Sequence, residues 1–181
     1  MNTELTSTVL NLGSGRKPRA GALNVDVTSL TNPELVCDLD KTPWPLPDAH
    51  FTEVHAYDVV EHLVDVVRTM EEIHRVCVPG AHVFITVPHF SSANSFTDPT
   101  HRHHFSARSM QYFTDEHELG FYSSARFRAL QTQIIFNPSL VNKLVRRLAN
   151  RFVVPYEERW AWVFPAWFLF FELEALKPNP T

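Results

Sequence analysis

The sequence is poor in glycine and cysteine, and it lacks any long apolar run. It contains 5 glycines and 2 cysteines, and Cys37 and Cys77 stand far apart, each within an apolar segment. This spacing matches no zinc-binding or dithiol redox motif, so we expect two buried free thiols, as is usual in a reducing compartment. No segment reaches the ~20 apolar residues that a membrane-spanning helix requires. We therefore predict a cytoplasmic protein without stable membrane insertion.

A strong excess of one charge is also missing. The chain has 16 Lys and Arg against 20 Asp and Glu, which gives a formal net charge of −4 and no electrostatic reason to expect a nucleic-acid partner. The first residues lack the basic start and apolar core of a signal peptide. Apolar residues make up 44% of the 181 residues, which is ample for one packed core. We expect a single domain over residues 1–181.

Short apolar segments that end in turn residues alternate with helical patterns. Residues 41–50 contain three prolines and are predicted to form a loop, and residues 88–105 are the longest irregular stretch. The alternation predicts an α/β domain of three layers with a mostly parallel sheet. The expected strands are 8–12, 23–27, 35–38, 53–58, 82–87, 126–136 and 168–176, and the expected helices are 60–77, 106–113 and one that starts at 137–139.

The first predicted strand runs into Gly13-Ser14-Gly15, a turn that lets a ligand approach the backbone closely. A dinucleotide fingerprint requires a third glycine where this chain has Pro18, and no P-loop sequence is present. With these two phosphate-binding motifs excluded, we expect a nucleoside-like ligand without a phosphate bridge. Asp26, at the end of the second strand, is placed to bind two ribose hydroxyls. Asp38 and Leu39 follow the third strand, where they can offer a carboxylate and an apolar wall to a purine.

Five segments carry a resemblance to a known family: "VLNLGSG" (9–15), "NVDV" (24–27), "CDLD" (37–40), "AYDVVEHL" (56–63) and "VPGAHVFITVPH" (78–89). In this order they resemble the motif series of class I S-adenosylmethionine-dependent methyltransferases, in the small-molecule, methyltransferase type 11-like branch. The resemblance covers a core of residues 8–115. It implies a Rossmann-like three-layer sandwich with a seven-stranded sheet whose last strand is antiparallel, completed and covered by residues 116–181.

The resemblance also implies a function. The cofactor would be S-adenosyl-L-methionine, and the acceptor would be an O or N atom of a small polar metabolite such as a sugar, a nucleotide-sugar or a natural product. The implied cofactor-binding residues are Asn11, Gly13, Ser14, Gly15, Asp26, Val27, Asp38, Leu39, Tyr57 and Asp58. Asn11 departs from the family pattern, because an acidic residue usually stands there to bind the ammonium of the cofactor.

The distance between the first two motifs is unusually short. Only ten residues separate Gly15 from Asp26, too few for a strand and a helix of about eleven residues. The helix after strand one is therefore expected to be shortened or absent, which leaves one side of the sheet without its usual cover. The Trp- and Phe-rich segment 160–171, or a second copy of the chain in a homodimer, is expected to cover it.

Histidines gather after the fourth and fifth strands, on the side where ligands bind in an open α/β sheet. If the acceptor must lose a proton, histidine is the usual base, and the candidates are His62, His89 and His101. His101 is preferred because Asp98-Pro99 fixes the turn before it, whereas His62 has an equally good structural interpretation as a partner of a neighbouring loop. The expected substrate contacts are Glu61, Phe90, Arg102 and His104.

Two alternatives stay open. The first is a metal-assisted methyltransferase in which a metal ion held by His101, His103 and His104 binds the acceptor. On an extended segment His101 and His103 point the same way, and Asp98 or Glu61 can complete a three-ligand site. Arg102 lies between them and opposes a cation, so we predict no metal. The second alternative is a non-catalytic protein that binds S-adenosylmethionine or serves a larger enzyme as a partner.

The predicted helix after residue 139 has one basic and one apolar face. The basic residues are Lys143, Arg146, Arg147 and Arg151, and the apolar residues opposite are Leu140, Leu144 and Leu148. A solvated face over a core face is the usual explanation of this pattern. An anionic substrate, or contact with a membrane surface beside the Trp-rich segment, is the alternative.

Overall fold

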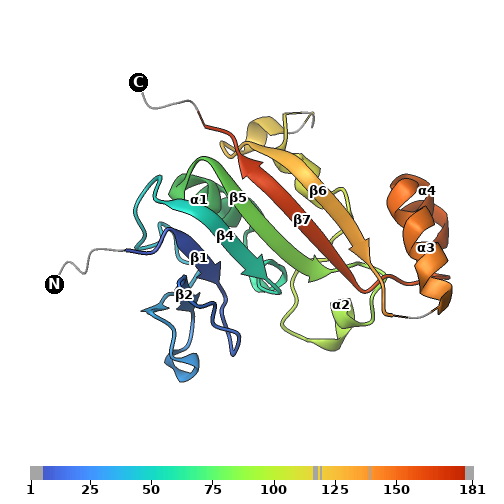
Figure 1. The fold of residues 1–181 in the computed structure, drawn as a ribbon, viewed down its shortest axis with the longest axis horizontal. Coiled ribbons are helices and arrows are strands. Elements are labelled where there is room, and N and C mark those ends of the chain that lie inside the picture. The colour runs from blue at the N-terminus through green and yellow to red at the C-terminus, as the bar shows by residue number, and fades with distance from the viewer. Residues whose placement is uncertain (1–5, 116–117, 119, 139, 178–181) are drawn as a thin grey trace.

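A seven-stranded mixed sheet organises the computed structural model, which describes residues 6–115, 118, 120–138 and 140–177 (Figure 1). The strand order is β3-β2-β1-β4-β5-β7-β6. The strands are β1 (Val9–Leu12), β2 (Leu23–Asp26), β3 (Leu35–Val36), β4 (Phe51–Tyr57), β5 (Cys77–Pro88), β6 (Phe127–Ile135) and β7 (Phe168–Ala175).

The strand directions confirm the expected Rossmann-like arrangement. β1 is parallel to β2 and β4, β2 is parallel to β3, and β4 is parallel to β5. β7 lies between β5 and β6 and is antiparallel to both. The carboxyl ends of β1, β2, β4 and β5 therefore meet at one edge of the sheet, where the turns after them can share a ligand.

Helices are few and mostly short. They are α1 (Val66–Val76), α2 (Asn94–Thr97), α3 (Leu140–Arg151) and α4 (Val153–Pro155), with 3-10 turns at Ser29–Thr31, Val60–His62, Ser109–Phe113 and Gly120–Tyr122 and a π-turn at Tyr156–Trp160. The helix expected at 60–77 is shorter than predicted, since it begins only after Asp65, whose carboxylate caps it by accepting from Arg68 N at 3.0 Å. Cys77, expected at the end of this helix, begins β5 instead.

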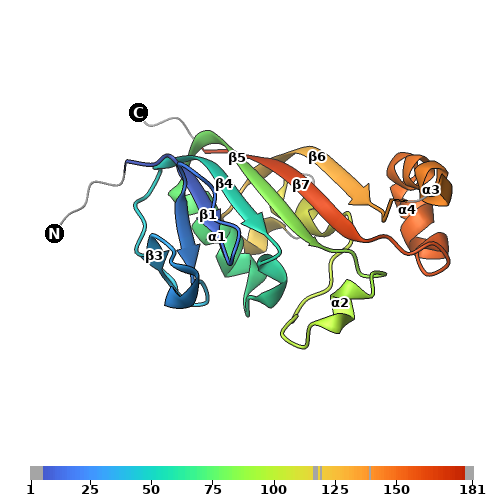
Figure 2. The ribbon, with the colours of Figure 1, turned by 60° about the horizontal axis from the view of Figure 1, so that its bottom comes forward.

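The core fills one face of the sheet. Alternate residues of β4, β5 and β7 point to this face, and α1 packs on it (Figure 2). The proline-rich loop adds Trp44, which is buried and donates from its indole to Leu39 O at 3.0 Å. The loop therefore covers part of this face of the sheet, as a helix does in other sandwiches.

The opposite face is open. Among the described residues, none between β1 and β2 is helical, as the short spacing predicts. Polar contacts take the place of the helix: Asn24 Oδ1 accepts from Asn11 Nδ2 at 2.7 Å and from Arg19 N at 2.8 Å, and the Arg19 guanidinium lies 3.1 Å from His55 Nδ1.

The C-terminal segment, one of the two expected covers, does not lie over this face. Phe168–Ala175 is a strand of the sheet itself. α3 and α4 lie beside the carboxyl end of β6 and the amino end of β7 (Figures 1 and 2). The reason is pairing: the apolar residues of β7 alternate into the core and fill the gap between β5 and β6. A strand in the sheet cannot also lie across it.

Candidate active site

The turn after β1 has room only for glycine at its first position. Gly13 has φ +60°, and a Cβ built there would lie 2.5 Å from Val59 Cγ2. Gly15 also has positive φ, at +49°, and its N–H donates to Asp26 Oδ2 at 2.7 Å. Ser14 N donates to Val25 O at 3.0 Å. The turn is thus fixed to the end of β2 and presents its backbone closely to any ligand above it.

Asp26 keeps capacity to accept further hydrogen bonds. Its side chain receives Gly15 N on one oxygen and Thr28 N, at 3.1 Å, on the other. Each carboxylate oxygen has two lone pairs, so a hydroxyl can still donate to either one. Val27 beside it is exposed. A carboxylate acceptor next to a narrow backbone turn fits the ribose of a nucleoside.

Three residues that were predicted to bind the cofactor are buried or contact other residues of the chain. Asn11 is buried and its amide donates to Asn24, so it holds the loop between β1 and β2 together. Leu39 is buried and belongs to the core. Asp38 is half-buried and pairs with Lys41 at 3.2 Å, at the exposed edge after β3. Of these three, only Asp38 has a side chain that is partly exposed to solvent.

The end of β4 is joined to β5 beside a cleft. Asp58 has φ +54°, its N–H donates to Thr86 O at 2.9 Å, and its carboxylate accepts from Thr86 Oγ1 at 2.8 Å. Tyr57 points to the open face, where its hydroxyl lies 3.0 Å from His55 Nδ1. Asp58 therefore faces the cleft, whereas Tyr57 faces the other side of the sheet.

The cleft lies where β4 and β5 end and β7 begins, and its volume is about 530 Å³. Most of its lining residues come from the turn after β4 and from the segment after β5, as expected for ligand binding in an open α/β sheet. The lining residues are Asp58, Glu61, His62, Pro88, Asn94, Thr97, Asp98, Pro99, His101 and Phe168.

Glu61 is the most unusual residue of the cleft. It is 1% exposed, and Oε2 has no hydrogen-bond partner in the part of the chain that the structure describes. Burial raises the pKa of its carboxyl to about 8, and the charges of Asp58 and Asp98 act in the same direction. A carboxyl with this pKa is mostly protonated at pH 7. Buried groups with such shifts are concentrated at functional sites.

The segment after β5 brings His101 to Glu61. Glu61 O accepts from Arg102 N at 2.8 Å and from His103 N at 3.3 Å. His101 Nε2 then lies 4.0 Å from Glu61 Oε1, and His101 Nδ1 lies 3.4 Å from Ser95 O. Because a carbonyl oxygen only accepts, this contact favours a proton on Nδ1 and a free lone pair on Nε2.

His62 packs edge-on against His101, with ring centroids 4.7 Å apart. Its Nδ1 lies 2.9 Å from Thr100 Oγ1, and the Thr100 hydroxyl donates to Asp98 Oδ1 at 2.7 Å. Since that hydroxyl has one proton, His62 Nδ1 must be the donor to Thr100. Burial first, and then the neighbouring His101, lowers the pKa of His62. The ring is therefore neutral at pH 7, with a free lone pair on Nε2.

His103 and His104 bind to other groups and do not lie beside His101. The alternative metal site of these three histidines is therefore not formed. His103 Nε2 lies 3.3 Å from Val64 O, and His104 Nδ1 lies 2.8 Å from Ser95 Oγ. The group of described residues that can offer ligand atoms, all within 4.8 Å of one another, is Glu61, His62 and His101. Asp98 is held by Thr100 and is not part of this group.

His89, the third histidine predicted as a catalytic candidate, lies in the core. The ring is 0% exposed, with Nδ1 2.8 Å from Ser91 Oγ and Nε2 3.3 Å from Glu157 Oε1. Glu157 Oε1 also accepts from Ala107 N at 2.6 Å. His89 thus joins the end of β5 to the π-turn near the C-terminus and does not line the cleft.

Among the predicted substrate contacts, only Glu61 lines the cleft. The Phe90 ring packs on Trp162, with centroids 5.6 Å apart, and Arg102 and His104 are exposed. Asn94 and Phe168 also line the cleft, although no sequence motif indicates either of them. Thr100 was also missed, although its position between Asp98 and His101 was a usable signal.

Comparisons with known proteins agree with this architecture. Residues 3–85 match the family model described as "Methyltransferase domain". No curated protein sequence matches the chain at a significant level.

Solved structures with the same fold share little sequence with the chain. A SAM-dependent methyltransferase from Archaeoglobus fulgidus has 16% identity and a TM-score of 0.64, over 92% of this chain and 85% of that one. The [4+2]-cyclase SpnF has 16% identity and a TM-score of 0.58, over 94% and 75%. Haemonchus contortus phosphoethanolamine N-methyltransferase 2, in complex with S-adenosyl-L-methionine, has 15% identity and a TM-score of 0.53, over 94% and 48%. The cyclase shows that the fold alone does not determine the reaction.

Proposed function

We propose that this chain, whose residues 3–85 match a methyltransferase family model and whose fold is that of solved S-adenosylmethionine-dependent methyltransferases, methylates an oxygen or nitrogen atom of a small polar acceptor. The observation that carries the proposal is the pair of Glu61 and His101, which face each other in the cleft at the carboxyl ends of β4 and β5. The cleft volume of about 530 Å³ is within the range of small-molecule sites.

S-adenosylmethionine is the cofactor of this class, and when bound it supplies a methyl group on a positively charged sulfur. The turn after β1 fits it, because a Cβ placed on Gly15 would have only Gly13 O within 4 Å, at 3.9 Å, so this part of the turn is open to a ligand. In this proposal Asp26 accepts hydrogen bonds from the ribose, and Asp58 lines the site from the end of β4. Asn11 contributes indirectly, by holding the loop between β1 and β2.

His101 would act as the base toward the acceptor. Its Nε2 is 4.0 Å from Glu61 Oε1, too far for a direct hydrogen bond, but one oxygen atom can contact both groups at about 2.8 Å. Protonated Glu61 can then donate to an acceptor oxygen, while Nε2 of His101 takes the proton that the acceptor loses. General-base catalysis of this kind contributes about 10²–10⁴-fold to a rate.

The test compares His101→Ala with His82→Ala, a histidine on β5 that lies outside the cleft. S-adenosylhomocysteine affinity is measured by calorimetry, and methyl transfer is measured against a panel of sugars, nucleotide-sugars and other polar metabolites. We expect both variants to keep the affinity, while His101→Ala loses turnover by about 10²–10⁴-fold. Unchanged turnover in His101→Ala would refute the base.

Two other outcomes of this experiment separate the remaining hypotheses. Absence of S-adenosylhomocysteine binding at sub-millimolar concentration would remove the cofactor from the proposal. Binding without turnover of any acceptor would favour the non-catalytic alternative, in which the chain binds the cofactor or assists a larger enzyme.

A metal-assisted reaction is the second candidate, favoured by the grouping of Glu61, His62 and His101. Two neutral imidazoles and a carboxylate are a common zinc-binding set. The Nδ1 atoms of both rings are held by outer partners, which is how metal-binding histidines are usually oriented. A cation at this position would also give Glu61 Oε2 a partner.

Elemental analysis of protein purified without a histidine tag tests this candidate, together with titration of zinc into the protein after dialysis against a chelator. The metal-assisted reaction predicts one tightly bound ion that His62→Ala loses and His103→Ala keeps. Full turnover of chelator-treated protein would eliminate it and leave the metal-free base.

A further inference from the structure

A large apolar surface lies at the C-terminal end of the structure, away from the cleft. Half of the exposed large apolar side chains in the described residues fall between positions 144 and 167. Six of them are more than half exposed, and we call these the apolar patch: Leu144, Leu148, Phe152, Trp160, Trp162 and Val163. Large exposed apolar patches on soluble domains mark sites of interaction.

The patch exists because α3 is anchored by a polar residue and not by its leucines. Asn150 Oδ1 accepts from Ile134 N at 2.8 Å, and Asn150 Nδ2 donates to Ile134 O at 2.9 Å. Ala149 beside it is 2% exposed, whereas Leu144 and Leu148 are 64% and 52% exposed. Leu144 and Leu148, which were expected on the core face of this helix, therefore point outward.

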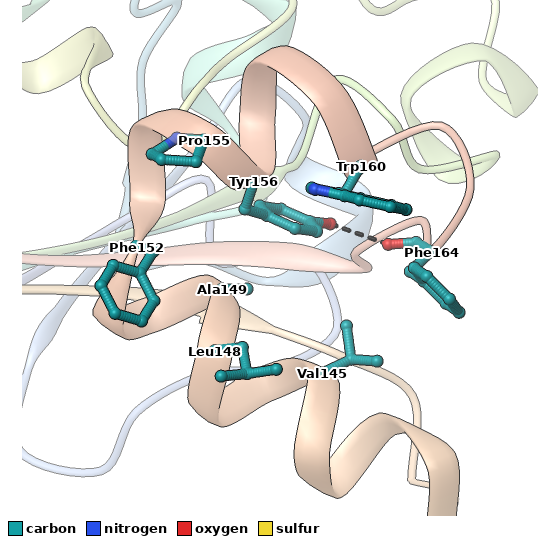
Figure 3. Close-up of a pocket in the computed structure, with 8 residues that line it drawn as sticks. All are labelled: Val145, Leu148, Ala149, Phe152, Pro155, Tyr156, Trp160 and Phe164. Atoms are coloured by element: carbon teal, nitrogen blue, oxygen red, sulfur yellow. Dashed lines mark hydrogen bonds between the residues drawn. The ribbon is translucent and has the colours of Figure 1, made fainter.

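An apolar hollow of about 480 Å³ opens between α3 and the segment that follows α4 (Figure 3). The Tyr156 hydroxyl closes one end of it by donating to Phe164 O at 2.9 Å. Aromatic and aliphatic side chains from both segments face the space, including Val145, Leu148, Phe152, Trp160 and Phe164. A hollow lined in this way accepts hydrocarbon and offers almost no polar partners.

Positive charges border the patch. Lys143, Arg147 and Arg151 are exposed, and helical spacing places Arg147 and Arg151 beside the two outward leucines of α3. The Arg151 guanidinium lies 5.4 Å from the centre of the Phe152 ring. None of these cations forms an ion pair within the described residues. Between residues 143 and 167, Glu158 is the exposed acidic side chain.

We infer that the apolar patch docks on the surface of an anionic phospholipid bilayer. Indole rings favour the boundary between water and acyl chains, and cationic side chains beside them are attracted to anionic headgroups. A second copy of the chain fits less well, because a two-fold pair would bring the same cations against one another. No helix among the described residues is long and apolar enough to span a bilayer, so the contact is a surface one.

The patch is connected to the segment that borders the cleft. Trp162 packs on Phe90, and Ala166 N donates to Ser91 Oγ at 3.1 Å. Docking would therefore hold the segment after β5 close to the bilayer, where the cleft can meet acceptors at the membrane surface. This consequence rests on the proposed function, whereas the docking itself does not.

Vesicle flotation at neutral pH tests the inference with the 181-residue chain. The probes are vesicles of phosphatidylcholine alone and of phosphatidylcholine mixed with phosphatidylglycerol. We expect the protein to float with the mixed vesicles and much less with the neutral ones. Arg147→Gln with Arg151→Gln should weaken binding by about fivefold for each charge removed. Trp162→Ser should weaken it by roughly tenfold, because an indole leaves the interface.

Matched controls separate docking from a change in net charge or folding. Arg108→Gln with Arg128→Gln removes two exposed charges elsewhere, and Leu30→Ser removes an apolar side chain that is 89% exposed near β2. Both controls should float like the unchanged protein, and circular dichroism checks that every variant is folded. Absence of flotation with mixed vesicles, or equal loss in the controls, would overturn the inference. So would a dimer in light scattering that Trp162→Ser dissociates, since a second copy would then occupy the patch.

Discussion

Replacement of Glu61 by glutamine should change how the stability of the protein depends on pH. Glu61 is 1% exposed and the pKa of its carboxyl is raised to about 8 from an ordinary value of 4.5. Glutamine has nearly the shape of the protonated carboxyl and does not ionise. The variant therefore keeps the packing of the neutral side chain and loses its titration.

The sign and size of the effect follow from proton linkage. With a raised pKa in the folded state, the unfolded chain releases the proton first as the pH rises, so the stability due to Glu61 is complete below pH 4.5 and is lost between pH 4.5 and 8. From pH 5 to pH 7 the loss amounts to about 2.5 kcal/mol. Glu61→Gln does not share this loss, so its advantage over the unchanged protein should grow by that amount.

Urea unfolding of both proteins at pH 5, 6 and 7, with a chelator present, measures the difference. Glu158→Gln is the control, because Glu158 is exposed and its replacement should leave the pH dependence unchanged. A difference between Glu61→Gln and the unchanged protein that stays constant over this range would refute a raised pKa at Glu61. If added zinc abolishes the pH dependence, the metal-assisted candidate gains support.

Three further replacements test the surroundings of the site. His89→Ala removes the ring that joins the end of β5 to Glu157, and we expect it to lower the free energy of unfolding by about 3 kcal/mol in urea titration. Gly13→Ala places a Cβ against Val59 at positive φ, so it should cost about 1–3 kcal/mol and weaken S-adenosylhomocysteine binding in calorimetry. Asp26→Asn replaces one acceptor oxygen by a donor amide, and roughly tenfold weaker binding is expected, with similar affinity contradicting the ribose contact.

The fold was largely readable from local pattern. In strand residues 82–87 burial alternates, since Val83, Ile85 and Val87 are buried and the residues between them are not. The expected strands differ from the observed ones mostly in where they begin and end. The absent helix between Gly15 and Asp26 was predictable because chain length alone forbids it. The start of α1 was predicted too early, since the apolar spacing continues backward through a separate 3-10 turn at Val60–His62.

The candidate site was readable only in part. Position along the chain indicated which loops meet at the carboxyl ends of the strands, so Glu61 and His101 were both selected. Their pairing was not predictable, because it depends on the backbone bonds that Glu61 O accepts from Arg102 and His103. Burial of Glu61, and hence its raised pKa, follows from that same contact and leaves no trace in the sequence.

Local pattern along the chain was enough to predict the succession of strands and turns, the glycine turn after β1, the missing first helix and the histidines after β4 and β5. The contacts of each histidine depend on the folded arrangement of distant segments. His89 lies in the core, while His62 and His101 meet Glu61 at the cleft. Likewise, only packing turned Leu144 and Leu148 outward. The physical reason is the same in each case: local spacing sets which residues share a strand or a helix face, whereas desolvation and partner choice depend on segments far apart in the chain.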